Sequence, residues 1–207
     1  MMQLFGYPTQ NTQKVLYVLE ELNLPYEFQL VDLFNRENKK PHILKLNPIG
    51  KVPILVHDGK PLFESGAICR YLANFNESPL YPKDNYQRAL VDQWMDFFSC
   101  HLGRWLSSLF HQKVLKPKMS KTPDPEACKE AENFISEQAK VIDHWLKGKS
   151  FLLGENLTIA DLFAYAYIEQ FKICNLSFKN YPNLKKWFET IEKRPSIAKG
   201  LEKIKHA

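Results

Sequence analysis

The chain changes character near residue 80, and this change limits the folds that it can adopt. Before that point short strand-like runs alternate with helix-like runs, and after it the strand signals disappear. Alternating strands and helices are typical of a mixed sheet covered by helices, whereas successive amphipathic helices form a bundle. We therefore predict an α/β domain over residues 1–76, a linker over 77–84 and an all-α domain over 85–207.

The first domain is predicted to follow the order βαβ and then αββα. Apolar residues recur at helical spacing over 15–22, and the turn His57-Asp58-Gly59-Lys60 between two apolar runs predicts a hairpin. Strands are expected at 3–6, 26–33, 53–56 and 61–63, and helices at 15–22, 42–46 and 65–75.

The second domain is predicted to be a helical bundle with an aromatic core. Its four long amphipathic stretches, separated by proline and glycine, are 86–115, 125–146, 158–171 and 183–194. Thr158 and Asp161 have the spacing of a capping box, and Leu157 and Leu162 that of a hydrophobic staple. We interpret this motif as a folding device without chemistry.

Composition and charge exclude several classes of protein. The apolar share of 44% and charged share of 25% are ordinary globular values. The net charge of +5 comes from dispersed Lys and Arg, so no nucleic-acid partner is expected. No leader-like N-terminus and no apolar run of membrane-spanning length is found, which favours a cytoplasmic protein without a membrane partner. The four cysteines have no zinc or C-x-x-C spacing, so we expect buried thiols and no metal.

Residues 8–15 lie where the first strand gives way to the first helix. Such a turn exposes side chains at the strand's carboxyl end and directs free N–H groups toward any anion placed there. A bound thiol would be stabilised as thiolate by both features. The alternative is that Thr9, Asn11 or Thr12 only caps the helix.

Two further motifs are compatible with a bound peptide. If the Val52–Pro53 bond is cis, Val52 turns its backbone N–H and C=O outward, ready to pair with an extended ligand. Ser65 is predicted to cap the helix that follows it, whose first N–H groups could hold a carboxylate. Capping alone would also explain Ser65.

In this order the motifs resemble the soluble glutathione transferase superfamily, whose members join a thioredoxin-like domain to a helical domain. The resemblance covers essentially the whole chain and is most specific over residues 47–53, 62–68 and 157–162. It implies that glutathione is the co-substrate, with Val52 pairing to its backbone and basic side chains neutralising its glycyl carboxylate. The implied glutathione-binding residues are Lys39, Lys51, Val52, Pro53, Glu64 and Ser65.

The resemblance implies a detoxification transferase that attacks a hydrophobic electrophile with the glutathione thiolate. Thr9 matches the serine of phi and theta-like bacterial classes, with one residue fewer before the helix. Thr9 with Asn11 is similar to the nu class, in which disulfide reduction is prominent. Tyr7 is near, but not at, the place of the catalytic tyrosine of other classes. A nu-like disulfide reductase or peroxidase, and a non-catalytic binding module of the same fold, remain the alternatives.

Two further expectations concern the substrate wall and assembly. Side chains proposed for the electrophile site, with core packing as the alternative for each, are Phe34, His101, Trp105 and Phe110. A homodimer is also expected, from the resemblance and from apolar side chains that exceed one helix face. Those side chains include Ile68, Leu72, Trp94 and Phe98.

Overall fold

The computed structural model describes residues 1–205, and its chain divides into two compact units. The first unit contains residues 1–83 and the residues from 192 onward, and the second contains residues 84–191. The first unit holds a four-stranded sheet in the order β2-β1-β3-β4. Its strands are β1 (Met2–Gly6), β2 (Tyr26–Leu30), β3 (Ile54–His57) and β4 (Lys60–Phe63).

The sheet is mixed, as predicted for a thioredoxin-like domain. Strand β1 pairs parallel to β2 and antiparallel to β3, which pairs antiparallel to β4. The β3–β4 hairpin turns through Asp58 (φ 49°) and Gly59 (φ 75°). Two successive left-handed residues give a turn whose twist matches that of the flanking strands, which explains the Asp-Gly sequence.

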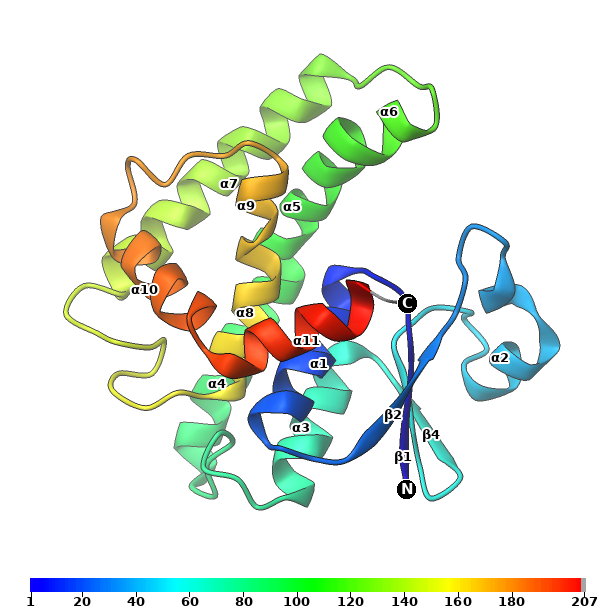
Figure 1. Ribbon diagram of the computed structural model, residues 1–207. Coiled ribbons are helices and arrows are strands. Elements are labelled where there is room, and N and C mark those ends of the chain that lie inside the picture. The colour runs from blue at the N-terminus through cyan, green and yellow to red at the C-terminus, as the bar shows by residue number, and fades with distance from the viewer. Residues whose placement is uncertain (206–207) are drawn as a thin grey trace. The chain divides into compact units, whose positions relative to one another are not determined.

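Helices cover both faces of this sheet. Figure 1 shows α1 (Gln10–Glu21) and α3 (Ser65–Phe75) on one side of the strands, and α2 (Pro41–Leu46) on the other. Under α2 lies a small apolar cluster built on Val31, Ile43 and Ile54. The short 3₁₀ turn η1 (Glu37–Lys39) leads into α2. The sequence therefore gave the right order of elements in this domain.

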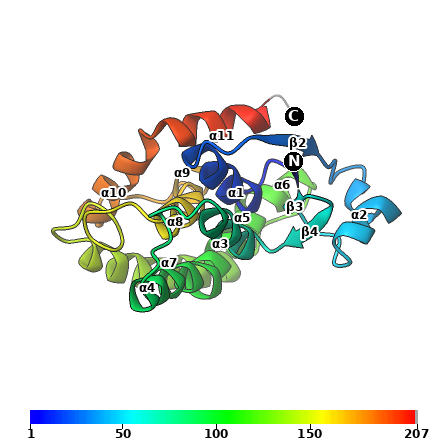
Figure 2. The ribbon, with the colours of Figure 1, turned by 90° about the horizontal axis from the view of Figure 1, so that it is seen from below.

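The C-terminal helix is a feature that the sequence did not predict. Proline at position 195 was interpreted as a break, but it opens α11 (Pro195–Lys205), where a missing N–H costs nothing. Helix α11 belongs to the first unit and runs beside α1 and β2 in Figure 2. At Gly200 an added Cβ would lie 2.8 Å from the Tyr17 ring, so glycine permits this close approach.

An ion pair fastens α11 to α1. Glu21 accepts hydrogen bonds from both Arg194 nitrogens facing it and from the Ser196 hydroxyl at 2.6 Å. Burial opposes ionisation of Glu21, but the Arg194 and Ser196 hydrogen bonds hold its pKa below the ordinary value. The last helix was predicted to be part of the helical domain, which was expected to extend to residue 207. In the structure this helix packs in the first unit instead.

The second unit contains only helices, apart from an isolated bridge at Phe151 and Gly154. The predicted long helix begins at Asn85 and is interrupted by two π-helical turns. Its parts are α4 (Asn85–Phe97), η2 (Phe98–Leu102), α5 (Gly103–Phe110), η3 (His111–Leu115) and α6 (Lys116–Lys118). The other helices are α7 (Pro125–Trp145), α8 (Ile159–Ile168), α9 (Gln170–Ile173) and α10 (Pro182–Glu192).

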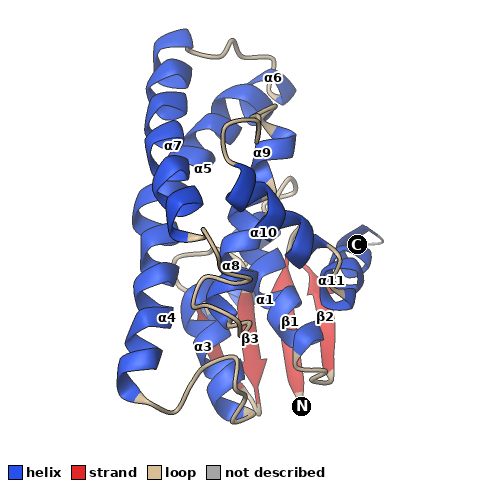
Figure 3. Ribbon diagram, turned by 90° about the vertical axis from the view of Figure 1, so that its left-hand side faces the viewer, coloured by secondary structure: helices blue, strands red, loops and turns tan. Residues whose placement is uncertain are grey.

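Helix α7 packs antiparallel to the long interrupted helix, as Figure 3 shows. Trp94 meets Trp145 with ring centroids 5.1 Å apart, and Trp105 stacks on Phe134 at 4.3 Å. Both pairs fit a single antiparallel alignment of the two helices, so a row of aromatic contacts joins them. Aromatic packing of this kind adds about 0.5–1.5 kcal/mol per pair beyond area burial.

The capping box at α8 is confirmed. Asp161 is fully buried and accepts four hydrogen bonds: from the backbone N–H and hydroxyl of Thr158, from the Leu152 N–H and from Trp187 Nε1, all at 2.8–3.0 Å. Burial raises the pKa of the Asp161 carboxyl, while these donors act in the opposite direction. This carboxylate therefore joins the start of α8 to the loop before it and to α10.

Two expectations about burial were wrong. The apolar residues invoked for dimerisation are all buried within the chain: Ile68 and Leu72 on α3, Trp94 on α4 and Phe98 on η2. Cys69 and Cys174 are buried as expected, but Cys128 is only partly buried and Cys100 is exposed on the π turn η2. Over residues 1–205, no helix combines the length and hydropathy needed to cross a membrane.

Candidate functional site

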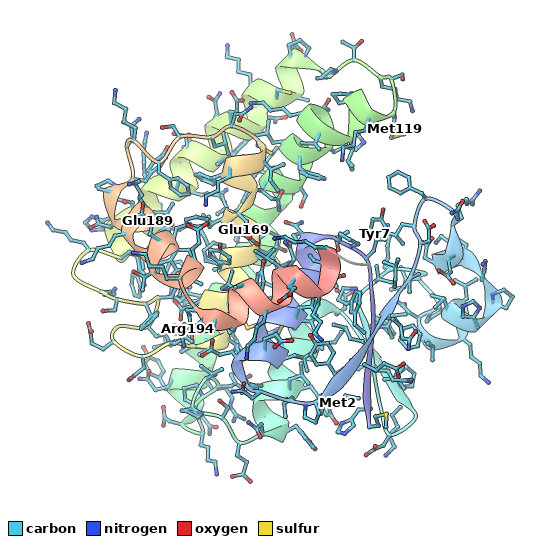
Figure 4. The ribbon with its side chains drawn as sticks, in the orientation of Figure 1. Met2, Tyr7, Met119, Glu169, Glu189 and Arg194 are labelled. Atoms are coloured by element: carbon cyan, nitrogen blue, oxygen red, sulfur yellow. The ribbon has the colours of Figure 1, made fainter. Side chains whose placement is uncertain are left out.

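The turn between β1 and α1 carries the first group of predicted site residues. In Figure 4, Met2 and Tyr7 mark the two ends of β1, and Thr9 follows as the N-cap of α1. The Thr9 hydroxyl oxygen accepts the Thr12 N–H at 3.4 Å. The capping interpretation is therefore correct for Thr9, and it leaves the hydroxyl proton available for a second partner.

A second hydroxyl lies behind the first. Thr12 is fully buried, its oxygen accepts the Tyr7 N–H at 3.3 Å, and it lies 3.3 Å from the Thr9 oxygen. Because Thr12 already accepts from Tyr7, one consistent arrangement has Thr12 donating to Thr9 and Thr9 donating outward. Gly6 makes room for this packing, since a Cβ there would lie 2.5 Å from the Thr12 methyl group.

Asn11 occupies the first turn of α1, where its amide oxygen accepts a hydrogen bond from Lys14 Nζ at 2.7 Å. The two residues are three positions apart and share one side of the helix. The sequence singled out Asn11, but gave no role to Lys14 or to the buried position of Thr12. The one available signal was a lysine directly before the apolar run 15–19.

Lys14 is a buried cation, only 1% exposed. Burial lowers the pKa of its ammonium to about 7, while the neighbouring Cys69 and Glu64 act in the opposite direction. Cys69 also donates its thiol to the Lys14 carbonyl at 3.6 Å, and burial raises the pKa of that thiol to about 12. Cys69 is therefore a neutral packing residue rather than a nucleophile.

The buried ammonium predicts a pH dependence of stability. Unfolded Lys14 keeps its proton up to about pH 10.5, whereas the folded chain releases it near pH 7. Folding therefore releases a proton in this window, and the free energy of unfolding rises with pH, by about 2 kcal/mol between about pH 7 and pH 9.

Urea unfolding of the parent chain and of Lys14→Met at several pH values checks this prediction. The parent should gain stability over the window, and Lys14→Met should lose most of that gain because it has no proton to release there. An equal pH dependence in both chains would contradict the lowered pKa of Lys14 in the folded chain.

The predicted cis bond at Val52–Pro53 is confirmed. The loop before it is held by Asn47, whose amide donates to the Lys51 carbonyl at 2.9 Å. Lys39 lies against the same loop and donates to the Ile49 carbonyl at 3.2 Å. The structure thus brings Lys39 to the turn that precedes Lys51 and Val52.

Gly50 and Asn38 complete this loop, and neither was predicted as a site residue. Gly50 has φ +64°, and a Cβ there would lie 2.8 Å from Lys39 Nζ. The Asn38 amide donates to the Gly50 carbonyl at 2.8 Å. These contacts fix the backbone beside the basic side chains.

The start of α3 differs in one respect from the prediction. Glu64, rather than Ser65, is the N-cap, and Ser65 is the first helical residue and largely buried. The Glu64 side chain makes no capping hydrogen bond and is exposed. Its backbone has φ 70° and ψ 112°, a strained conformation for a residue other than glycine. Such strain is concentrated at functional sites.

The four residues proposed for the electrophile site have different surroundings. Phe34 is 79% exposed and meets the Tyr7 ring edge-on at 6.0 Å, so it is not a core residue. His101 is exposed on η2 beside the Phe97 ring, whereas Trp105 stacks on α7. Phe110 is partly buried at the end of α5. For Trp105, the stacking is the packing role that the sequence left open.

Within residues 1–205, no cluster of three or more His, Cys, Asp or Glu side chains could hold a metal ion. The β1–α1 turn, the Val52 loop and the start of α3 present hydroxyls, amides, ammonium groups, backbone N–H groups and the Glu64 carboxylate. This set of groups suits a small anionic peptide.

Comparison with known proteins agrees with the fold. Residues 1–74 match the family model for the glutathione S-transferase N-terminal domain, and residues 106–195 match that for the C-terminal domain. Glutathione S-transferase F13 of Arabidopsis thaliana is 31% identical over 192 residues, which are 90% of this chain and 88% of that protein.

Two solved structures extend the comparison. Glutathione transferase F2 from Populus trichocarpa is 28% identical, with a TM-score of 0.93 over 100% of each chain. A glutathione transferase from Burkholderia graminis, with two glutathione molecules bound per subunit, is 29% identical. It has a TM-score of 0.89 and covers 100% of this chain, which covers 89% of that one.

A thioredoxin-like domain joined to an all-helical domain defines a class of two-domain proteins. Within that class, the chain belongs to the glutathione S-transferase family.

Proposed function

We propose that this protein binds glutathione in its first unit and activates the thiol as a thiolate for attack on a small hydrophobic electrophile. The observation that carries the proposal is the β1–α1 turn, where the Thr9 hydroxyl and the Asn11 amide lie at the positive end of α1. The residues proposed to bind glutathione are Lys39, Lys51, Val52, Pro53, Glu64 and Ser65. The proposed location is cytoplasmic, as in the sequence-based expectation.

The groups at this turn are strong enough for the task. A thiol with a pKa near 8.5 is only about 3% thiolate at pH 7. One hydrogen bond to a charged acceptor supplies about 1.5–3 kcal/mol, and the end of a helix adds roughly 0.3–1 kcal/mol. Lowering the thiol pKa by about two units needs roughly 2.7 kcal/mol, so no general base is required.

A second candidate activity is the reduction of disulfides. The Burkholderia graminis relative binds two glutathione molecules per subunit. Reduction of a substrate disulfide consumes two glutathione molecules, which leave as glutathione disulfide while the substrate is released as two thiols. The pairing of Thr9 with Asn11 favours this nu-like alternative. Peroxidase activity would use the same thiolate.

The test is to measure binding and both reactions on one preparation. Retention on immobilised glutathione, eluted by free glutathione, is expected for either enzyme and for a non-catalytic glutathione-binding module. Conjugation of an aryl halide would support the transferase, whereas glutathione-dependent reduction of a mixed disulfide would favour the reductase. A protein without retention and without either activity would contradict the proposal.

We also propose a homodimer, on grounds that differ from the buried residues named at first. Tyr71 and Phe75 on α3 are exposed by 38% and 52%, and their rings stack at 6.1 Å. His57 completes this aromatic patch, 2.7 Å from the Tyr71 hydroxyl. Exposed aromatic groups of this kind are enriched at protein interfaces.

Sedimentation should therefore give twice the mass of 24.2 kDa at micromolar concentration. Replacing both exposed rings, in Tyr71→Ser/Phe75→Ser, should shift the protein toward the monomer. Tyr86→Ser removes an aromatic ring that is 70% exposed outside the patch and serves as the control. A parent protein that sediments as a monomer would rule out the dimer.

A further inference from the structure

Lys14 has a position that neither the proposed chemistry nor the packing of α1 explains. A lysine side chain is almost never fully buried unless it has partners. Here the ammonium lies beneath the first turn of α1, 2.7 Å from the amide oxygen of Asn11. An apolar residue at this helical position would fill the core without the cost of burying a charge.

The contact with Lys14 determines which way the Asn11 amide faces. An asparagine amide has an accepting oxygen and a donating nitrogen, and exchanging them would place N–H groups against the N–H groups of Lys14. While Lys14 carries its proton it has no lone pair, so the oxygen is fixed on the Lys14 side. The Asn11 amide nitrogen must then face the other way, where its two N–H groups can donate to a ligand at the end of the helix.

We propose that Lys14 is a positioning residue that holds the Asn11 amide with its N–H groups toward the glutathione sulfur. This inference rests on the proposed function, because it presumes that Asn11 donates to the thiolate. Lys14 itself does not touch the sulfur. It acts by fixing the donor in one of its two orientations before the thiol arrives, so that the hydrogen bond needs no reorganisation.

Two other roles for Lys14 make different predictions. A buried positive charge could stabilise the thiolate directly, without Asn11. Alternatively, Lys14 could matter only for folding, through Cys69 on α3 and the other groups that it meets. A double-mutant cycle separates these roles, because two residues acting through one hydrogen bond give less than the sum of their separate effects.

The experiment measures the pKa of bound glutathione from its thiolate absorbance in the parent, Asn11→Ala, Lys14→Met and the double variant. Asn11→Ala should raise this pKa by about one to two units. Lys14→Met should raise it by about one unit, and the double variant should not exceed Asn11→Ala. Lys14→Arg keeps N–H donors at this position and should stay close to the parent.

NMR relaxation of the ¹⁵N-labelled Asn11 side-chain amide measures the mobility of that amide. Replacing Lys14 would not change this mobility if the lysine had only a structural role. This signal, assigned by its absence in Asn11→Ala, should be rigid in the parent and in Lys14→Arg and mobile in Lys14→Met. If Lys14→Met does not fold, the Lys14→Arg result still decides, since a raised thiol pKa in that folded variant would overturn the proposal.

Two outcomes of the double-mutant cycle would also overturn the proposal that Lys14 positions the Asn11 amide. An unchanged thiol pKa in folded Lys14→Met would leave Lys14 a structural residue, and additive effects in the double variant would make it an independent charge. Failure of the underlying function looks different. In that case Asn11→Ala itself would leave the thiol pKa unchanged, or the parent would not bind glutathione.

Discussion

Asp161→Ala is expected to destabilise the protein by about 4 kcal/mol, because four buried donors lose their acceptor at once. Two of those donors are backbone N–H groups at the start of α8 and in the loop before it, and one is the indole of Trp187 on α10. For a chain of this length such a loss lowers the Tm by roughly 10 °C. Thermal unfolding followed by circular dichroism measures the change.

Asp143→Ala is the matched control for this loss. Asp143 accepts three hydrogen bonds at the start of α10, from Leu184 N–H and from two Asn183 groups, but it is only partly buried. Water can replace the lost acceptor there, so we expect a cost of about 1 kcal/mol, as for an ordinary cap. Equal losses in the two variants would show that burial does not set the cost.

Asn11→Ala and Thr9→Ala are expected to raise the pKa of bound glutathione by about one to two units each and to lower turnover at pH 7 about tenfold. The reason is that each removes one donor to the thiolate, while the groups proposed to hold the rest of glutathione remain. Glutathione affinity should therefore change little. Thiolate absorbance against pH, with kcat and KM measured separately, distinguishes these effects.

The controls depend on the capping geometry at Thr9. Thr9→Ser keeps the hydroxyl that both caps α1 and faces outward, so most activity should survive, whereas Thr9→Ala should also lose about 1 kcal/mol of stability. Tyr7→Phe keeps the backbone N–H that donates to Thr12 and should have a small effect. If Asn11→Ala shows the larger loss, Asn11 is the main donor; an unchanged pKa in Thr9→Ala removes Thr9 from the mechanism.

Much of this fold could be predicted because its signals are local. The Asp58-Gly59 turn, the capping box at Thr158 and the helical spacing of apolar residues are each contained within a few residues. Their physical causes, namely backbone sterics, unpaired N–H groups at helix ends and the burial of one helix face, act over the same short range. The order of elements and the candidate residues at the β1–α1 turn follow from them.

The features that only the tertiary structure decided depend on residues far apart in the sequence. Helix α11 packs beside α1 through contacts such as the one between Arg194 and Glu21, and no local pattern connects positions 173 residues apart. Ser65 was expected at the N-cap, but the strained backbone of Glu64 moves the start of α3 by one residue. The sequence alone does not show that Lys14 is buried, and it becomes a buried side chain beside Asn11 only when α1 is covered by its neighbours. Burial depends on what covers a side chain, so the sequence determined the residues at this site and the tertiary packing decided which way they face.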